Sequence, residues 1–273
     1  MVDDTRANPI SSAMVEVTGL RKVYDDHRRS IEAIRDVTFS VAAGELVCII
    51  GPSGAGKTTL LKCIAGLLPA SGGRVVLEGQ EVTEPPAAMA VVFQEYGRSL
   101  FPWMSVWENV NLPLKRKSMS AAQREKLVND ALAAVDLADV HRAYPWQLSG
   151  GMQQRVAIAR AMAYEPHVLL MDEPFAAVDA QTRADLEDLI RRLWHRMGVT
   201  VLFVTHDIDE AVYLGQRVLV LSSSPTVVME TIAVDLPDER SQLETRSLPR
   251  FVELRKHLYA QIQASKQGRR FDQ

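Results

Sequence analysis

A glycine-rich loop with the sequence GPSGAGKTTLLK occupies residues 51–62, directly after the apolar run LVCII. Gly51, Gly56, Lys57 and Thr58 satisfy the pattern G-x-x-x-x-G-K-[ST]. Glycines let the backbone curl so that successive N–H groups point at phosphate oxygens, and the following helix adds a positive N-terminal end. The lysine suits the β- and γ-phosphates, and the threonine hydroxyl suits magnesium. A chance match in a glycine turn is the alternative, but the flanking strand and helix favour a phosphate-binding loop.

Acidic residues follow a second apolar run, in HVLLMDEP. If this run is a parallel strand, Asp172 and Glu173 lie at the edge of the sheet where ligands of open α/β sheets bind. Asp172 is then placed to hold magnesium through water, and Glu173 faces the γ-phosphate side. His206 in TVLFVTHD ends another such run and is expected at the same edge. The alternative for Asp172 and Glu173 is that they merely end a strand, and the alternative for His206 is that it is a capping or core residue.

A second anion site is indicated by LSGGMQQR. Ser149, Gly150 and Gly151 precede a helix, so a hydroxyl and bare N–H groups lie at a positive helix end. A glycine-softened helix start is the alternative. The glycine-rich loop that carries Lys57 is called the lysine loop below. If this site and the lysine loop both bind one γ-phosphate, a head-to-tail dimer is the economical arrangement, with Ser149 of one chain facing Lys57 of the other.

The elements that must position these residues are short, continuous apolar runs separated by helical patterns. Such runs are typical of strands buried on both faces of a mostly parallel sheet. We predict five strands, at residues 46–50, 90–93, 168–171, 200–205 and 217–221. Helices are predicted at 120–137, where Ser120 and Gln123 form a capping box, at 152–165, and at 248–263.

Composition limits the function classes. A formal net charge of −3 argues mildly against nucleic-acid binding. The two cysteines, Cys48 and Cys63, are expected to be buried hydrophobes in a reducing, cytosolic compartment. The N-terminal residues lack the apolar stretch of a secretory signal. No apolar run approaches the roughly 20 residues that span a bilayer, so a role at a membrane would require a partner.

The order of the motifs resembles that of the ATP-binding cassette (ABC) ATPases. The resemblance is carried by GPSGAGKTT, VVFQEYGRS, LSGGMQQR, VLLMDEP, AAVD and VTHD. It implies an α/β fold with a P-loop NTPase (RecA-like) core, an antiparallel β subdomain and an inserted helical subdomain. The implied boundaries are 14–235 for the ATPase domain (core 14–94 and 166–235, helical subdomain 95–165) and 236–273 for a C-terminal helical tail.

The resemblance also implies ATP and Mg²⁺ as cofactors and assigns roles to individual residues. Tyr24 would stack on adenine, Glu173 would be the catalytic carboxylate, and His206 would be the γ-phosphate switch. Gln94 would link the magnesium site to a membrane partner, and Asp179 would lie in a loop that crosses the dimer interface. The implied sets are Glu173, His206 and Gln94 for catalysis; Tyr24, Gly51, Ser53, Gly54, Ala55, Gly56, Lys57, Thr58, Thr59, Ser149, Gly150, Gly151 and Asp179 for the nucleotide; and Thr58, Gln94 and Asp172 for the metal.

Within this family, the segments at 93–110 and 175–183 and the tail resemble bacterial importer subunits for nitrate, sulfonate, taurine or related solutes. The implied partners are a second copy of the chain, transmembrane permease subunits and, indirectly, a substrate-binding protein, with no nucleic acid. The implied location is the cytoplasmic face of the inner membrane. The aromatic stretch at 101–104, with Trp107, is either core or a groove for the permease.

Two other classes are weighed against an importer subunit. Cassette ATPases that act on DNA or ribosomes usually carry long coiled coils or two fused cassettes, and this chain has one lysine loop and one LSGG. This class remains the alternative. A small-molecule kinase would not need LSGGMQQR and ranks below both.

Overall fold

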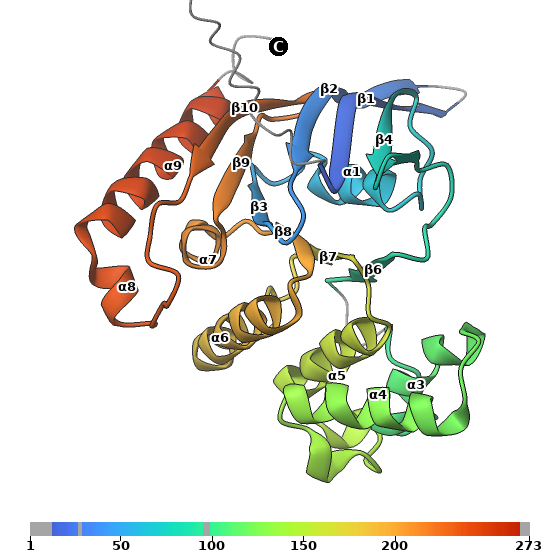
Figure 1. The fold of residues 1–273 in the computed structure, drawn as a ribbon. Helices are drawn as coiled ribbons and strands as arrows, with labels where there is room; N and C mark the ends of the chain where they lie inside the picture. Colours follow the sequence, from blue (N-terminus) through green and yellow to red (C-terminus); the bar gives the residue numbers. More distant parts are fainter. Residues whose placement is uncertain (1–12, 27–28, 95–98, 268–273) are drawn as a thin grey trace, which may run out of the picture.

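The computed structural model describes residues 13–26, 29–94 and 99–267, and its fold is built around one mixed sheet (Figure 1). Among these residues the sheet has ten strands in the order β5-β4-β1-β2-β10-β9-β3-β8-β7-β6. Their bounds are β1 Val15–Asp26, β2 Arg29–Val41, β3 Leu46–Ile50, β4 Gly72–Leu77, β5 Gln80–Glu81, β6 Met89–Val92, β7 Val168–Asp172, β8 Thr200–Val204, β9 Arg217–Leu221 and β10 Thr226–Ala233.

The parallel half of the sheet consists of β9, β3, β8, β7 and β6, and each neighbouring pair is parallel. All five predicted strands are confirmed, each to within one residue at either end. Every residue of β3, β7 and β8 is buried, because helices cover both faces of this half. Burial on both faces explains why these strands are uninterrupted apolar runs rather than alternating ones.

The antiparallel half consists of β1, β2, β4 and β5, as the family resemblance implied. Individual strands here could not be placed from the sequence. The register of β1 against β2 shifts three times between Val17 and Val23, so the side-chain alternation is broken. Val15, Val17 and Leu20 nevertheless face a second apolar core beneath α1.

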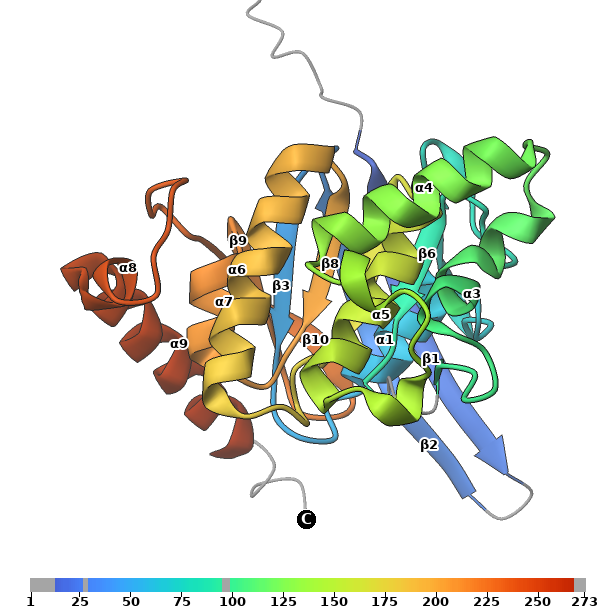
Figure 2. The same ribbon diagram turned by 90° about the horizontal axis from the view of Figure 1, so that it is seen from below.

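Helices surround the parallel half (Figures 1 and 2). α3 and α4 pack with α5 into one group, and α8 and α9 lie at the opposite end of the molecule. The bounds are α1 Lys57–Ile64, α3 Val106–Asn111, α4 Ala121–Ala134, α5 Gly150–Ala163, α6 Ala180–Met197, α7 Ile208–Leu214, α8 Glu244–Ser247 and α9 Pro249–Gln267, with 3-10 turns η1 Pro113–Arg116, η2 Ala138–Val140 and η3 Pro145–Gln147.

Local sequence patterns account for the start of α4 and for the buried face of α9. The predicted capping box at the start of α4 is confirmed, because the Ser120 and Gln123 side chains each accept from the other residue's backbone N–H. In α9, which covers the predicted helix at 248–263, the apolar side chains Phe251, Leu254, Leu258 and Ile262 are buried in the main core. Within the described ranges no helix is both long and apolar enough to cross a bilayer.

Candidate nucleotide-binding site

The carboxyl ends of β3, β7 and β8 meet at one edge of the sheet. Met171 of β7 pairs with Phe203 of β8, and Ile49 of β3 pairs with Val204. Beyond the strand ends, Glu173 N donates to Val204 O at 2.9 Å and Thr205 N donates to Ile49 O at 3.1 Å. The residues that follow the three strands are therefore neighbours in space.

The loop between β3 and α1 forms a backbone cradle. Gly54 and Gly56 have φ values of 75° and 76°, in the left-handed region that favours glycine. Gly51 packs so closely on β9 that a Cβ there would lie 3.1 Å from the Leu221 carbonyl oxygen. No side chain caps α1, whereas α3, α4, α5, α6 and α7 all have capping side chains. The N–H groups at the start of α1 remain available to an anion.

Lys57 is buried in this cradle, with a relative exposure of 6%. Its Nζ donates to the carbonyl oxygens of Gly51, at 3.1 Å, and Pro52, at 3.3 Å. It also lies 3.5 Å from Glu173 Oε1. The ammonium is thus held between the loop backbone and the end of β7, which is where a bound phosphate would need a positive charge.

Asp172 lies beside the cradle and accepts a hydrogen bond from Thr58 Oγ1 at 3.2 Å. Burial raises the pKa of this carboxyl above its ordinary value, the Thr58 hydrogen bond opposes that rise, and the negative charge of Glu173 adds to it. A buried carboxylate beside a hydroxyl, with its charge incompletely balanced, is the kind of oxygen-donor set that Mg²⁺ prefers. The residues present fit a magnesium ion.

Glu173 is held in an unusual backbone conformation at the end of β7. Its φ of 44° lies in the left-handed region, which is uncommon for a side-chain-bearing residue and is concentrated at functional sites. Its two carboxylate oxygens face different partners, because Oε2 lies 2.9 Å from His206 Nδ1 and Oε1 lies near Lys57. Glu173 therefore bridges the cradle lysine and the histidine after β8.

The remaining predicted residues on this side of the molecule are Tyr24, Thr59 and Gln94. Tyr24 extends from β1 with an exposed ring, and its OH lies 3.2 Å from Thr59 Oγ1 in α1. Gln94 follows β6, whose Val92 pairs with Met171, so it lies at the level of the carboxyl end of β7. Gln94 is exposed.

The LSGG segment does not belong to this sheet edge: it lies at the start of α5, in the group of helices formed by α3, α4 and α5. Ser149 is exposed and caps α5 by accepting from Met152 N at 3.3 Å. No hydrogen bond or ion pair among the described residues joins Ser149 to the lysine loop. Gly151 instead packs on α6, where a Cβ would lie 2.4 Å from Thr182 Cγ2. Asp179 caps that helix by accepting from Thr182, the residue on which Gly151 packs, so Asp179 and Gly151 lie near one another.

Thr226 supports the loop between β3 and α1, and nothing in the sequence pattern indicated this role. Thr226, fully buried at the start of β10, donates its hydroxyl proton to the carbonyl oxygen of Ala55 inside the cradle. Because β10 also pairs in parallel with β2, this contact fixes the loop to the far half of the sheet. A single threonine in a β-rich segment gives no indication of such a contact.

Glu210 in α7 makes stability depend on pH. Burial raises its pKa from 4.5 to about 7, against the opposing hydrogen bond from Thr205. Because the folded state holds this proton more tightly than the unfolded chain, the free energy of unfolding should fall as the pH rises from about 4.5 to about 7. We expect Glu210→Gln to flatten this decline by up to about 3 kcal/mol. Urea denaturation at several pH values measures the free energy of unfolding of both proteins. If this free energy falls equally steeply with pH in the wild type and in Glu210→Gln, the prediction is wrong.

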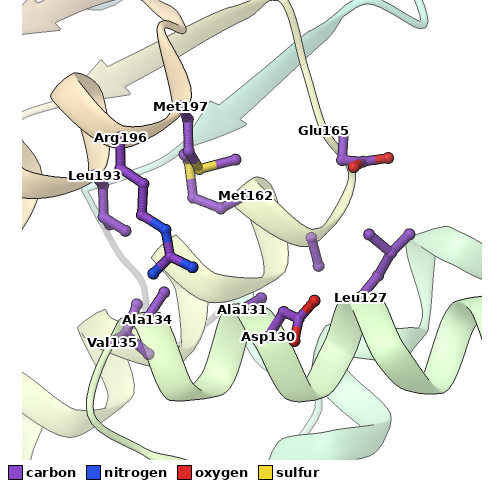
Figure 3. A pocket seen from close by; sticks show the side chains of 11 residues that line it. Leu127, Asp130, Ala131, Ala134, Val135, Met162, Glu165, Leu193, Arg196 and Met197 are labelled. Carbon is purple, nitrogen blue, oxygen red and sulfur yellow. The ribbon is translucent and has the colours of Figure 1, made fainter.

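A separate hollow of about 150 Å³ lies between α4, the end of α5 and the end of α6 (Figure 3). Its walls are mostly apolar, with the charged side chains of Asp130 and Arg196 lying toward one another across it. None of its lining residues follows a strand of the parallel sheet. This hollow is therefore not the nucleotide site.

The aromatic stretch is divided between surface and interior. Trp103 has 69% of its surface exposed, while Trp107 packs against the main core. The rings of Phe101 and Trp103 contact each other with their centroids 5.4 Å apart.

Comparisons with known proteins agree with this geometry. The nitrate import ATP-binding protein of Synechocystis is 43% identical, over 85% of this chain and 87% of the relative. The taurine import ATP-binding protein of Pseudomonas entomophila is 41% identical, over 87% of this chain and 93% of the relative. Among solved structures, a dimeric post-hydrolysis state of an ATP-binding cassette bound to ADP and Pi matches with a TM-score of 0.70. That match is 33% identical and covers 81% of this chain and 99% of the other.

The fold comparison confirms the predicted P-loop NTPase architecture. A family profile described as "ABC transporter" matches residues 34–176, which include the lysine loop, LSGG and the acidic strand end. The chain is an ATP-binding ATPase, and it belongs to the ABC transporter family.

Proposed function

We propose that this ATPase drives a membrane importer for a small solute of the nitrate, sulfonate or taurine kind, through separate permease subunits. The observation that carries the ATP-hydrolysis step of the proposal is the bridge from Lys57 through Glu173 to His206 at the edge of the parallel sheet. Relatives named as nitrate and taurine import ATP-binding proteins support the importer assignment.

Each residue of the bridge has a proposed role toward bound ATP. The cradle N–H groups and Lys57 bind the phosphates, and Tyr24 stacks on the adenine. Glu173 orients the attacking water and accepts its proton, while His206 contacts the γ-phosphate. Ser53, Gly54, Ala55 and Thr59 complete the nucleotide contacts.

Magnesium would be held by Thr58 and Gln94, with Asp172 acting through water. When bound, the ion neutralises charge that develops on the phosphate oxygens. The raised pKa of the buried Asp172 carboxyl and its Thr58 hydrogen bond support this placement.

The ATP site is proposed to be completed by a second copy of the chain. Ser149 and Gly150 are exposed at the start of α5, and among the described residues no hydrogen bond or ion pair joins Ser149 to the lysine loop of its own chain. In a head-to-tail pair they would face the partner's ATP, with Asp179 lying at the interface. The dimeric cassette among the structural relatives supports this arrangement. ATP then closes the dimer, and hydrolysis reopens it.

A mixing experiment tests the composite site. Lys57→Ala and Ser149→Ala chains should each be inactive, because each lacks one half of both sites in its own dimer. An equal mixture forms heterodimers with one intact site, so we expect about one quarter of the wild-type ATPase rate from random pairing. A mixture without activity would contradict the shared site.

Ser120→Ala is the matched control for Ser149→Ala. Both serines cap a helix with nearly identical backbone angles, φ −64° and ψ 160° at Ser149 and φ −68° and ψ 160° at Ser120. Each substitution should destabilise the chain by about 1 kcal/mol. Only Ser149→Ala should also lower ATP turnover.

The transport role is tested in proteoliposomes that contain the chain with its co-purified permease. ATP-dependent uptake of nitrate, taurine and an alkanesulfonate is measured, with Lys57→Ala as the inactive control. Uptake of one of these solutes is expected. Uptake of none, with ATPase activity intact, would refute the proposed solute class while leaving the ATPase assignment in place.

The remaining features follow from the same proposal. We propose a core of residues 14–94 and 166–235, a helical subdomain of 95–165 and a tail of 236–273. Residues 27–28, 95–98 and 268–273 of these segments lie outside the described ranges. The chain would associate with the cytoplasmic face of the inner membrane through its permease, and a substrate-binding protein would deliver the solute. Trp103 and its neighbours would contact the permease. The relatives named as importers favour this function over the alternative at DNA or ribosomes.

A further inference from the structure

Asp179, proposed above to face the partner chain, is fastened to the first turn of α6. Its Oδ1 accepts from Thr182 N at 3.0 Å, and its Oδ2 accepts from Thr182 Oγ1 at 2.7 Å. α6 then continues for 18 residues to Met197. A displacement of Asp179 therefore moves the start of a long helix rather than a free loop.

His206 is fastened to the start of α7 in a similar way. The next residue, Asp207, caps α7 by accepting from Asp209 N at 2.8 Å and Glu210 N at 3.2 Å. The preceding residue, Thr205, donates its hydroxyl proton to Glu210 Oε2 at 2.5 Å. His206 thus lies between two residues that are both bound to the first turn of α7.

Arg183 connects these two helix starts. It lies one turn into α6, where its backbone N donates to Asp179 O at 2.9 Å. Its Nη1 donates to Asp207 Oδ2 at 3.1 Å, and its Nε lies 3.4 Å from Glu210 Oε1. One guanidinium therefore contacts two carboxylates in the turn that begins directly after His206.

The burial of this contact distinguishes it from a surface ion pair. Glu210 has 6% of its side chain exposed and Arg183 has 31%, so solvent screens the pair only in part. The Arg183 side chain donates one directed hydrogen bond, to Asp207, while its Nε lies 3.4 Å from Glu210 as an ion pair without a hydrogen bond. The planar guanidinium therefore fixes the position of Asp207 by direction and attracts Glu210 by charge.

We infer that Arg183 is a positioning residue that transmits the position of Asp179 to His206, so that docking of the partner chain sets the γ-phosphate contact within the same chain. This inference rests on the proposed roles of Asp179 and His206. It adds that the two act through one guanidinium and not independently.

The test measures steady-state ATPase activity of the full chain at a concentration where ATP-dependent dimers form. Arg183→Gln should lower kcat at least tenfold, since misplacing a catalytic group by about 1 Å can cost about a hundredfold, while ATP affinity stays within about twofold. Arg192→Gln is the matched control, because Arg192 is on the same helix, is exposed and, among the described residues, has one ion-pair contact, at 3.7 Å to Asp136. It should leave kcat unchanged.

A double-mutant cycle separates coupling from simple helix packing. If Asp179 acts through Arg183, the Asp179→Ala and Arg183→Gln pair should be no slower than the slower single variant. Multiplicative losses in the pair, or unchanged kcat in Arg183→Gln alone, would overturn the inference. Wild-type ATPase activity and its loss in Lys57→Ala are measured in the same series, so a failure of the proposed function is recognised separately.

Discussion

Glu173→Gln is expected to leave ATP binding intact and to lower ATP turnover by about 10²–10⁴-fold, the range that a positioned acid–base group contributes. The amide has the volume of the carboxylate, but it cannot accept a proton from water. It also removes one negative charge beside the γ-phosphate position, so ATP should bind at least as tightly. ATP without hydrolysis keeps the dimer closed. Size-exclusion chromatography with ATP and magnesium should therefore show a stable dimer, and a phosphate-release assay gives the rate.

Glu165→Gln is a close control for this substitution. Glu165 also adopts a left-handed backbone conformation, with φ of 52° against 44° at Glu173, so any backbone cost of the exchange is shared. It is exposed at the end of α5, away from the lysine loop. Wild-type turnover in Glu173→Gln would remove the proposed role of this carboxylate, whatever the control shows.

The parallel half of the fold was predictable because burial leaves a strong local signal. β3, β7 and β8 are buried along their whole length, so each appears in the sequence as an unbroken apolar run. The order of the strand ends in a parallel sheet then brings Asp172, Glu173 and His206 to one edge. That inference needed no knowledge of distances.

The contacts between segments far apart in the sequence were not predictable in this way. Thr226 supports the cradle from 171 residues away, and Arg183 reaches Asp207 across 24 residues. Neither residue belongs to a spacing pattern, because the contact depends on where two separate elements pack. The left-handed backbone conformation of Glu173 could not be predicted from the sequence either, because glutamate has no preference for this conformation.

The separation of LSGG from the lysine loop is the finding that most affects the interpretation of the sequence. The motifs alone suggested that Ser149 of one chain faces Lys57 of another. In the structure Ser149 lies in the helical group and caps α5, whereas Lys57 is enclosed by β3, β7 and its own loop. The proposal of a shared site thereby gains a structural reason.

Lys57→Ala is expected to weaken ATP binding by at least about a hundredfold, which corresponds to about 3 kcal/mol for a buried charge-assisted contact. The substitution also leaves the carbonyl oxygens of Gly51 and Pro52 without their donor and Glu173 without its contact to the Lys57 ammonium. Some loss of stability is therefore expected as well. Equilibrium binding of a fluorescent ATP analogue measures the first effect, and thermal unfolding without nucleotide measures the second.

Lys57→Met separates the charge from the packing, because methionine retains much of the apolar stem in the cradle and lacks only the ammonium. If phosphate attraction is the role of Lys57, Lys57→Met should bind ATP as poorly as Lys57→Ala while unfolding nearer the wild-type temperature. Lys62→Ala, an exposed position in the last turn of the same helix, should bind ATP normally. ATP affinity restored by methionine would instead mean that Lys57 supports the loop and that the N–H groups of the cradle bind the phosphates by themselves.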